Sequence, residues 1–339
     1  MAKKHILLIG GYTSTNIGNG FYEMGVKYML SNISDEFVVH CTSDLSLYYW
    51  DKFRAEQDGF EPAEHFRGLD YIVWMGPVFD AVSMKKWKDV LERAGNQGSR
   101  IMCLGAGSSQ YTKEEVAECK KILKKYPFYI LISRDTWTYK AYKDDFTYAY
   151  DGICPAFFSS LCFQKWKLDM PPFAVFDFEQ YTEPDFIRDS SGFAFHGGNW
   201  QGGGLKKRTV VTEMIQKYPK EQFDGLMIIR TKNTCIRPEN IGGKYRGRNI
   251  YLSDVPEDYL NIYANAQAVF SDRVHACAGA LAQGTPAMFF GRTPRAKLFE
   301  RFFKNHSAAL YSKPVSLDMN MLDNERNRQL DFLRKVLMK

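Results

Sequence analysis

The sequence lacks the cysteine pattern that a metal site or a disulfide framework would need. Its seven cysteines stand singly along the chain, with no C-x-x-C pair and no short Cys/His spacing. Zinc sites and disulfide-rich folds depend on closely spaced cysteines and histidines. We therefore expect no metal, no metal cofactor and no disulfide.

A long apolar run is also missing at the start of the chain. The first apolar run, 5–9, follows Lys3 and Lys4 and ends at Gly10. This run is too short for the core of a signal peptide or for a membrane span. The sequence therefore predicts a soluble, cytoplasmic protein.

The chain has only a small excess of positive charge. It contains 45 Lys and Arg against 39 Asp and Glu, a net charge of +6 over 339 residues. This balance argues against a nucleic-acid partner and is compatible with a small anionic substrate. With 45% hydrophobic residues, a chain of this length predicts a globular protein of two domains.

Short apolar runs alternate with amphipathic stretches in the first half of the chain. This alternation predicts an α/β domain in which parallel strands are joined by helices. The expected strands are 5–9, 37–41, 71–75, 100–104 and 128–133, and the expected helices are 20–30, 83–94, 112–126 and 136–142.

Periodicity is lost at 170–192, where prolines and serines collect, and then resumes in a second α/β pattern. Such a stretch is typical of a hinge between domains. The sequence predicts an N-terminal Rossmann-like domain at 1–170, a hinge at 171–192, a second Rossmann-like domain at 193–315, and a helix closing the chain at 316–339. Expected elements of the second half are strands at 193–196, 225–230, 250–252, 268–270 and 287–290 and helices at 207–217, from 256, and at 322–338.

Two such domains facing each other across a cleft bind ligands where strands lead into helices. After the strand 268–270, Ser271 is expected to cap a helix that begins at Asp272. Arg273 at its start offers a planar fork for a carboxylate or phosphate, and His275 is a candidate proton donor. The alternative is an Arg273–Asp272 pair with His275 buried in a polar network.

Basic residues and glycines follow other strands. Arg295 comes shortly after the strand 287–290 and is expected near Arg273, although such a run also begins solvated helices. The first strand leads into GGYTSTNIGNG, which is neither a Walker loop nor a dinucleotide fingerprint. This loop, with Asn16, Gly18 and Asn19, either binds another ligand or only turns the chain.

Three further residues are candidates with an equally ordinary structural alternative. Arg134 follows the strand 128–133 but has Asp135 beside it, which favours a local ion pair. Asp151 is a candidate base toward a hydroxyl, or a turn residue. Trp200, in the glycine-rich loop FHGGNWQGGG, is a candidate for stacking on a sugar, or part of a mobile loop.

Taken together, these motifs resemble the polysaccharide pyruvyl transferase family over most of the chain. The most specific match is S-x-R-x-H…G-x-P, present here as Ser271, Arg273, His275, Gly284 and Pro286. The family's loop G-x-x-x-x-N-x-G-D is similar to GYTSTNIGN. Further similarities are Arg134-Asp135-Thr136-Trp137-Thr138 to R-D-x-x-S, Asp151 with Pro155-Ala156 to D-P-A, and Thr293-Pro294-Arg295 to a D-P-K turn.

Two positions depart from the family pattern. Asn19 replaces the usual aspartate of the first loop, and Trp74-Met75-Gly76-Pro77 stands where the family has a glycine-rich turn. Both lie on the side that faces the acceptor in that family. The departures therefore bear on the identity of the acceptor.

The resemblance implies a GT-B-like fold and transfer of a pyruvyl group from phosphoenolpyruvate to a sugar, which forms a pyruvate ketal and releases phosphate. It implies His275 as the general acid, with Asp151 on the acceptor side as base. No cofactor is implied, because phosphoenolpyruvate is a co-substrate. The implied phosphoenolpyruvate-binding residues are Arg273, Arg134, Arg295 and Ser271, and the implied acceptor-binding residues are Asn16, Gly18, Asn19 and Trp200.

The implied partners are phosphoenolpyruvate and a sugar acceptor on a glycan or a lipid-linked oligosaccharide. A lipid-linked acceptor would bring the protein into peripheral contact with a membrane. Two alternatives stay open from the sequence: a GT-B-like glycosyltransferase that uses a nucleotide sugar, and a non-catalytic relative that binds glycans.

Overall fold

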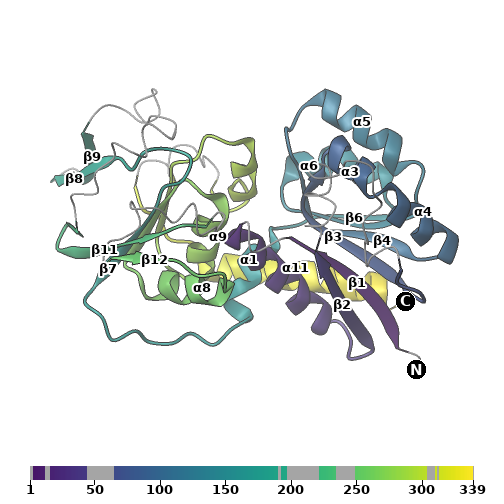
Figure 1. Ribbon diagram of the computed structural model, residues 1–339, viewed down its shortest axis with the longest axis horizontal. Coiled ribbons are helices and arrows are strands. Elements are labelled where there is room, and N and C mark those ends of the chain that lie inside the picture. The colour runs from purple at the N-terminus through teal and green to yellow at the C-terminus, as the bar shows by residue number, and fades with distance from the viewer. Residues whose placement is uncertain are drawn as a thin grey trace, which may run out of the picture. The chain divides into compact units, whose positions relative to one another are not determined.

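The computed structural model describes residues 3–11, 16–43, 65–189, 192–196, 221–233, 249–303, 310 and 313–338 (Figure 1). The chain divides into two compact units. The first unit comprises Met1–Tyr12, Tyr22–Phe158 and Asp323–Lys339, and the second comprises Thr13–Phe21 and Ser159–Leu322. Each unit contains one predominantly parallel sheet with helices, so the expected α/β class is confirmed.

The sheet of the first unit has six parallel strands in the order β2-β1-β3-β4-β5-β6. All five expected strands are present, and Tyr148–Asp151 adds a sixth at one edge. Strands buried on both faces are near-continuous apolar runs, which made the central ones easy to predict. The bounds are β1 Lys4–Gly10, β2 Phe37–Ser43, β3 Tyr71–Phe79, β4 Arg100–Ser108, β5 Phe128–Ser133 and β6 Tyr148–Asp151.

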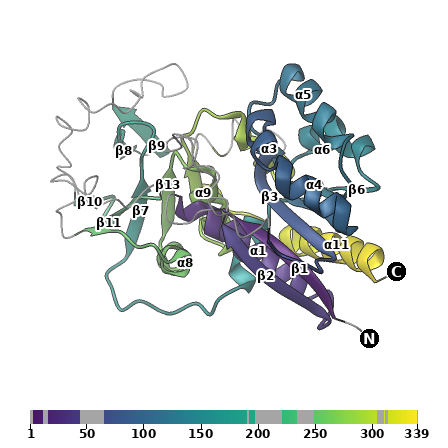
Figure 2. The same ribbon diagram turned by 45° about the vertical axis from the view of Figure 1, so that its right-hand side comes forward.

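Helices cover both faces of this sheet. In Figures 1 and 2, α3, α4, α5 and α6 lie on one face, and α1 and α11 lie on the other. The single helix expected at 83–94 is two helices, because the backbone of Trp87 (φ −86°, ψ 7°) leaves helical geometry between them. The bounds are α1 Ile17–Ser31, α3 Ala81–Lys86, α4 Lys88–Gln97, α5 Lys113–Leu123, α6 Thr136–Tyr142, η2 Lys143–Asp145, η3 Pro155–Leu161 and α11 Met319–Leu337.

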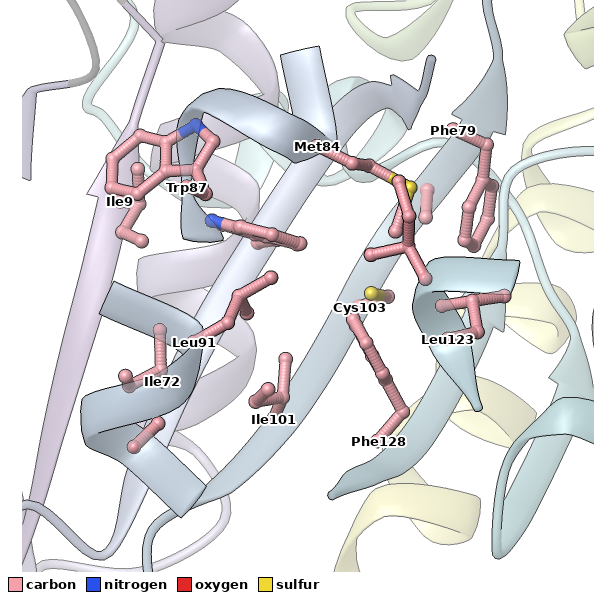
Figure 3. Packing of buried hydrophobic residues seen from close by; sticks show 14 of the residues in the cluster. Ile9, Ile72, Phe79, Met84, Trp87, Leu91, Ile101, Cys103, Leu123 and Phe128 are labelled. Carbon is pink, nitrogen blue, oxygen red and sulfur yellow. The ribbon is translucent and has the colours of Figure 1, made fainter. Parts of the chain in front are cut away.

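Large apolar side chains fill the space between the sheet and helices α3–α5 (Figure 3). Trp74 of β3 packs edge-on against Trp87, with ring centroids 5.8 Å apart, and lies 6.0 Å from Phe128. Aromatic pairs of this kind add roughly 0.5–1.5 kcal/mol to the stabilisation from burial. Trp74, which departs from the family pattern, is therefore a core residue of the first unit.

From Asp323 onward the C-terminal helix α11 belongs to the first unit, and its polar side chains Glu325, Arg326 and Gln329 are buried. Gln329 accepts the backbone N–H of Ile153 through its Oε1 atom at 2.8 Å. Arg326 donates through Nε to the carbonyl oxygen of Phe157 at 2.9 Å. These bonds satisfy backbone groups of the segment after β6, so α11 fixes that segment as well as covering the sheet.

We predict that Gln329→Met lowers the free energy of unfolding by about 1–3 kcal/mol, because the N–H of Ile153 would stay buried without an acceptor. Asn327, exposed on the same helix, is the matched control. Asn327→Met should change stability by no more than about 0.5 kcal/mol. Urea unfolding followed by circular dichroism measures both, and equal stability of the two variants would contradict the assigned role of Gln329.

The sheet of the second unit has the order β10-β11-β7-β13-β14, with β12 also paired to β11. Only β10 is antiparallel to its neighbour. The bounds are β7 Phe173–Asp177, β10 Gln222–Phe223, β11 Leu226–Thr231, β12 Ile250–Tyr251, β13 Ala268–Ser271 and β14 Ala287–Phe289, with α8 Pro256–Asn265, α9 Val274–Ala282 and η7 Pro294–Phe299.

The stretch 171–192, expected to be a hinge, contains strands instead. Phe173–Asp177 forms β7, a buried central strand between β11 and β13. Asp185–Asp189 forms β8, which pairs antiparallel with β9 at Gly192–His196. The prolines at 171, 172 and 184 flank these strands and obscure the four-residue apolar run of β7. In this part of the chain the first unit ends at Phe158 and the second begins at Ser159. The helix expected at 207–217 lies outside the described residues.

Helix α9 is buried and consists mostly of small residues. Its residues from His275 to Ala282 are all buried, and most are alanine or glycine. A Cβ atom at Gly279 would lie 3.1 Å from Leu260 and 3.2 Å from Phe21, so the small residue permits close packing. In the part of the chain that the structure describes, no helix has the length and apolar character to cross a membrane.

Candidate functional site

The start of α9 carries the two residues that the sequence singled out. Strand β13 ends at Ser271, and helix α9 begins at Val274, two residues later than expected. Arg273 is the N-cap, with an extended backbone (φ −105°, ψ 121°). Residues two apart on a regular helix point about 200° apart, but Arg273 lies outside the helix. The helix therefore does not force its side chain away from that of His275.

Ser271 does not cap the helix. Its hydroxyl accepts the N–H of Arg273 at 2.9 Å and donates to Oδ2 of Asp177 at 3.2 Å. The N-cap residue Arg273 makes no side-chain capping bond. The side chain of Ser271 is fully buried, so Ser271 acts on the backbone of Arg273 and offers no surface to a ligand.

Asp272 does not serve as a simple partner for Arg273. Its Oδ2 atom accepts backbone N–H groups of Glu179, Gln180 and Tyr181 at 2.7–2.9 Å. Burial raises the pKa of Asp272 to about 6, an effect that these N–H donors oppose. Asp272 thus fixes the loop that follows β7, and this loop lies next to the start of α9.

The start of α1, which follows the first loop, packs against His275 within the second unit. Asn16 accepts the N–H of Gly18 through Oδ1 at 3.1 Å, and its carbonyl accepts the N–H of Asn19 at 2.9 Å. A Cβ atom at Gly18 would lie 2.8 Å from the Cβ of His275 and 3.3 Å from its Nδ1. The structure thus brings Asn16, Gly18 and Asn19 to the start of α9, whereas the sequence assigned them to the N-terminal domain.

A buried polar cluster beneath these residues was not predicted from the sequence. Asp177, fully buried at the end of β7, accepts from Nδ2 of Asn233, which also donates to the Tyr263 hydroxyl at 3.0 Å. The N–H of Asn233 donates to Oε1 of Glu179. An acid directly after the apolar run FAVF was the available signal, because polar residues at strand ends lie at the functional edge of a parallel sheet.

Burial raises the pKa of the acidic groups in this cluster. Burial raises the pKa of Asp177 well above its ordinary value, and the charges of Glu179 and Asp272 add to the effect, while Arg273 opposes it. Burial also raises the pKa of Tyr263, with the charge of Asp177 contributing. Arg273 therefore lies in the electrostatic field of buried carboxyl groups.

Arg295 belongs to η7, which contacts α9. Its N–H donates to the hydroxyl of Thr293 at 3.3 Å, and its side chain is half-buried. Strands β13 and β14 are parallel neighbours. Because Arg273 and Arg295 follow these neighbouring strands, they come from the same edge of the sheet.

Arg134 lies in the first unit, only 1% exposed. Its guanidinium donates to the carbonyl oxygen of Ser108 at 3.3 Å and to the Tyr111 hydroxyl at 3.1 Å, and its Nε lies 3.8 Å from Oδ2 of Asp135. Burial by itself lowers the pKa of Arg134, but Tyr111 and Asp135 outweigh it and raise that pKa. These contacts are the local pairing that the sequence left open as the alternative for Arg134.

The remaining candidates are Asp151 and Trp200. Asp151 ends β6, and its Oδ2 atom accepts the hydroxyl of Thr136 at 2.8 Å. Trp200 lies outside the described residues. Among the residues that the structure describes, no group of three or more His, Cys, Asp or Glu side chains is arranged to hold a metal ion.

The contact between Gly18 and His275 predicts opposite effects for one substitution at two helical glycines. Gly18→Ala should lower the free energy of unfolding by about 1–3 kcal/mol, because the new methyl group overlaps His275. Gly95→Ala, on an exposed helix position with its nearest neighbour at 3.8 Å, should raise it by about 0.5–1 kcal/mol. Thermal unfolding measures both changes, and stabilisation by Gly18→Ala would contradict the close packing.

The fold is similar to that of known sugar-nucleotide enzymes. One similar structure is a protein assigned as a UDP-N-acetylglucosamine 2-epimerase from Listeria monocytogenes, with a TM-score of 0.51, 12% identity, and coverage of 98% of this chain and 88% of that one. Another UDP-N-acetylglucosamine 2-epimerase matches with a TM-score of 0.50, 10% identity, and coverage of 98% and 90%. At these identities the similarity concerns the fold alone, and that fold is GT-B-like, as expected.

A comparison with curated proteins finds no match. The sequence model of polysaccharide pyruvyl transferases, by contrast, matches residues 16–294, which is most of the chain. The match begins at Asn16 of the first loop and ends at Pro294 of η7, so it includes the residues gathered around the start of α9. This chain belongs to the polysaccharide pyruvyl transferase family.

Proposed function

We propose that this protein transfers a pyruvyl group from phosphoenolpyruvate to a sugar of a glycan, forming a pyruvate ketal and releasing phosphate. The observation that carries the proposal is the position of Arg273 and His275 at the start of α9, in a chain that belongs to this family. Phosphoenolpyruvate carries a carboxylate and a phosphate. Guanidinium groups and helix N-terminal N–H groups are suited to both anions.

Arg273 and Arg295 are the proposed donor-binding residues. They follow neighbouring strands, and Arg273 stands where the N–H groups of α9 lack a capping side chain. We assign Ser271 an indirect role, because its buried hydroxyl holds the N–H of Arg273. Arg134 is assigned a structural role in the first unit, since its guanidinium is buried among Ser108, Tyr111 and Asp135.

His275 is the proposed general acid. It gives a proton to the methylene carbon of phosphoenolpyruvate, which leaves an electron-deficient centre at C2. One sugar hydroxyl adds to C2, the bond from C2 to the phosphate oxygen breaks, and a second hydroxyl closes the ketal. The two hydroxyl protons balance the reaction: one replaces the proton given by His275, and one leaves with phosphate. Asp151 is the proposed acceptor-side base, with its carboxylate oriented by Thr136.

The first loop has a different proposed role from the one that its sequence suggested. Gly18 packs against His275 and presents no side chain there, and its N–H is held by Oδ1 of Asn16. We propose that the segment Asn16–Gly18 forms the wall behind the imidazole and that Asn19 faces the reacting sugar. Trp200 remains a proposed stacking residue for the acceptor.

We predict phosphate release only when the protein has both phosphoenolpyruvate and a suitable acceptor. The assay supplies mannosides, β-galactosides and N-acetylhexosamines, as free glycans and as lipid-linked oligosaccharides, and mass spectrometry detects a product heavier by a ketal-linked pyruvate. UDP- and GDP-sugars replace phosphoenolpyruvate in a parallel series. Transfer from a nucleotide sugar, with none from phosphoenolpyruvate, would overturn the proposal in favour of a glycosyltransferase.

We also predict that two kinds of variant separate binding from chemistry. Arg273→Ala should raise KM for phosphoenolpyruvate by about 10–100-fold, because it removes charge-assisted hydrogen bonds. His275→Gln and Asp151→Asn should lower kcat by roughly 10²–10⁴ with little change in KM. Steady-state kinetics measure both constants, and Asp254→Asn, on an exposed residue of the second unit, is the control. Near-normal kcat in His275→Gln would remove His275 from the acid role.

A further inference from the structure

Asn233, two residues after the end of β11, connects separate parts of the second unit. It is 3% exposed, and its carbonyl oxygen accepts the backbone N–H of Ile17 at 2.7 Å. Its side-chain amide donates to Oδ2 of Asp177 and to the Tyr263 hydroxyl. Through these bonds Asn233 connects the start of α1 to Asp177 at the end of β7 and to Tyr263 of α8.

The hydrogen bond between Asn233 and Ile17 lies close to the imidazole of His275. Ile17 directly precedes Gly18, which packs against the Cβ and Nδ1 atoms of His275. The position of Ile17 is set by the carbonyl group of Asn233, and that carbonyl is held in place by the buried side-chain amide of the same residue. Removing the amide would release the segment that carries the carbonyl.

The carboxyl oxygen of Asp177 that binds Asn233 is also linked to Arg273. Oδ2 of Asp177 also accepts the hydroxyl of Ser271, which in turn accepts the N–H of Arg273. Asp177 is fully buried, so water cannot replace these hydrogen-bond donors. The carboxyl group of Asp177 therefore holds both the backbone at Arg273, through Ser271, and the segment at Gly18, through Asn233.

We propose that Asn233 is a positioning residue that holds the Asn16–Gly18 segment against His275, with Asp177 as its anchor. Where this concerns turnover, it rests on the proposed function. The side chain must be a hydrogen-bond donor toward Asp177, which is the property that asparagine has and aspartate lacks when ionised. The neighbouring titratable or charged groups are Asp177, Glu179, Asp272, Arg273, Tyr259, Tyr263 and Cys277.

The first test needs no enzymatic activity. Diethylpyrocarbonate modifies accessible imidazoles, and mass spectrometry reads the rate at each histidine. His275 is 8% exposed in the intact protein, so its modification is expected to be slow. Asn233→Ala should raise the rate at His275 about tenfold, because local opening becomes easier when the anchor is lost.

Two controls separate this effect from general destabilisation. Thr285→Val removes another buried hydrogen bond of the second unit, from Oγ1 of Thr285 to the carbonyl oxygen of Tyr263 at 2.8 Å. It should destabilise the protein to a similar degree and leave the rate at His275 unchanged. The exposed His65 of the first unit should react equally in all variants.

The second test uses turnover and pH. In Asn233→Asp, the new carboxyl lies against Asp177, and a hydrogen bond between them needs a shared proton. The kcat of this variant relative to wild type should rise by about tenfold as pH falls from about 8 to about 6. The relative kcat of Asn233→Ala should stay flat, and KM should change little in both variants.

The outcomes distinguish the two proposals. An unchanged modification rate at His275 in folded Asn233→Ala would overturn the positioning role, whatever the enzyme does. A raised rate together with a wild-type protein that shows no activity on phosphoenolpyruvate would support the positioning role and count against the proposed function. A pH-independent kcat ratio for Asn233→Asp would contradict the predicted shared-proton contact with Asp177.

Discussion

The second unit depends on how a buried carboxyl group at the end of β7 is satisfied. Asp177 has no access to water, and removing a carboxyl from water is costly unless donors replace it. Asn233 and Ser271 are these donors. Each residue also accepts a backbone N–H: the carbonyl of Asn233 accepts that of Ile17, and the hydroxyl of Ser271 accepts that of Arg273. The need to satisfy one buried oxygen therefore orders the chain on both sides of His275.

The first unit also contains a buried charged group, the guanidinium of Arg134. The buried guanidinium of Arg134 is matched by Tyr111, Asp135 and a backbone carbonyl, and burial with the nearby carboxylate raises the pKa of Tyr111 to about 12. Tyr111 donates to Asp135 at 2.7 Å, which also caps α6 through the N–H of Thr138. Gly107 leaves room for this group, since a Cβ atom there would lie 2.1 Å from Nε of Arg134. The motif at the end of β5 thus serves packing within the first unit.

The fold was largely predictable because buried parallel strands are continuous apolar runs, as in β4 and β5. β7 was missed because its five residues stand between prolines, a pattern that also marks linkers. Arg273 and His275 were identifiable because they follow a strand in a specific motif. Asp177 and Asn233 were not, because one acid and one amide carry no local pattern, and the two residues lie 56 positions apart in the chain.

By itself, the sequence determined the α/β class, most strands and helices, the family resemblance, and the importance of the segment from Ser271 to Pro286. These follow from local periodicity and from motifs whose residues are close in the chain. Only the tertiary structure decided that the start of α1 packs against His275, that Ser271 supports Arg273 from below, and that the guanidinium of Arg134 is buried. The reason is physical: burial and hydrogen-bond partners depend on which distant segments meet, and no local pattern encodes that meeting.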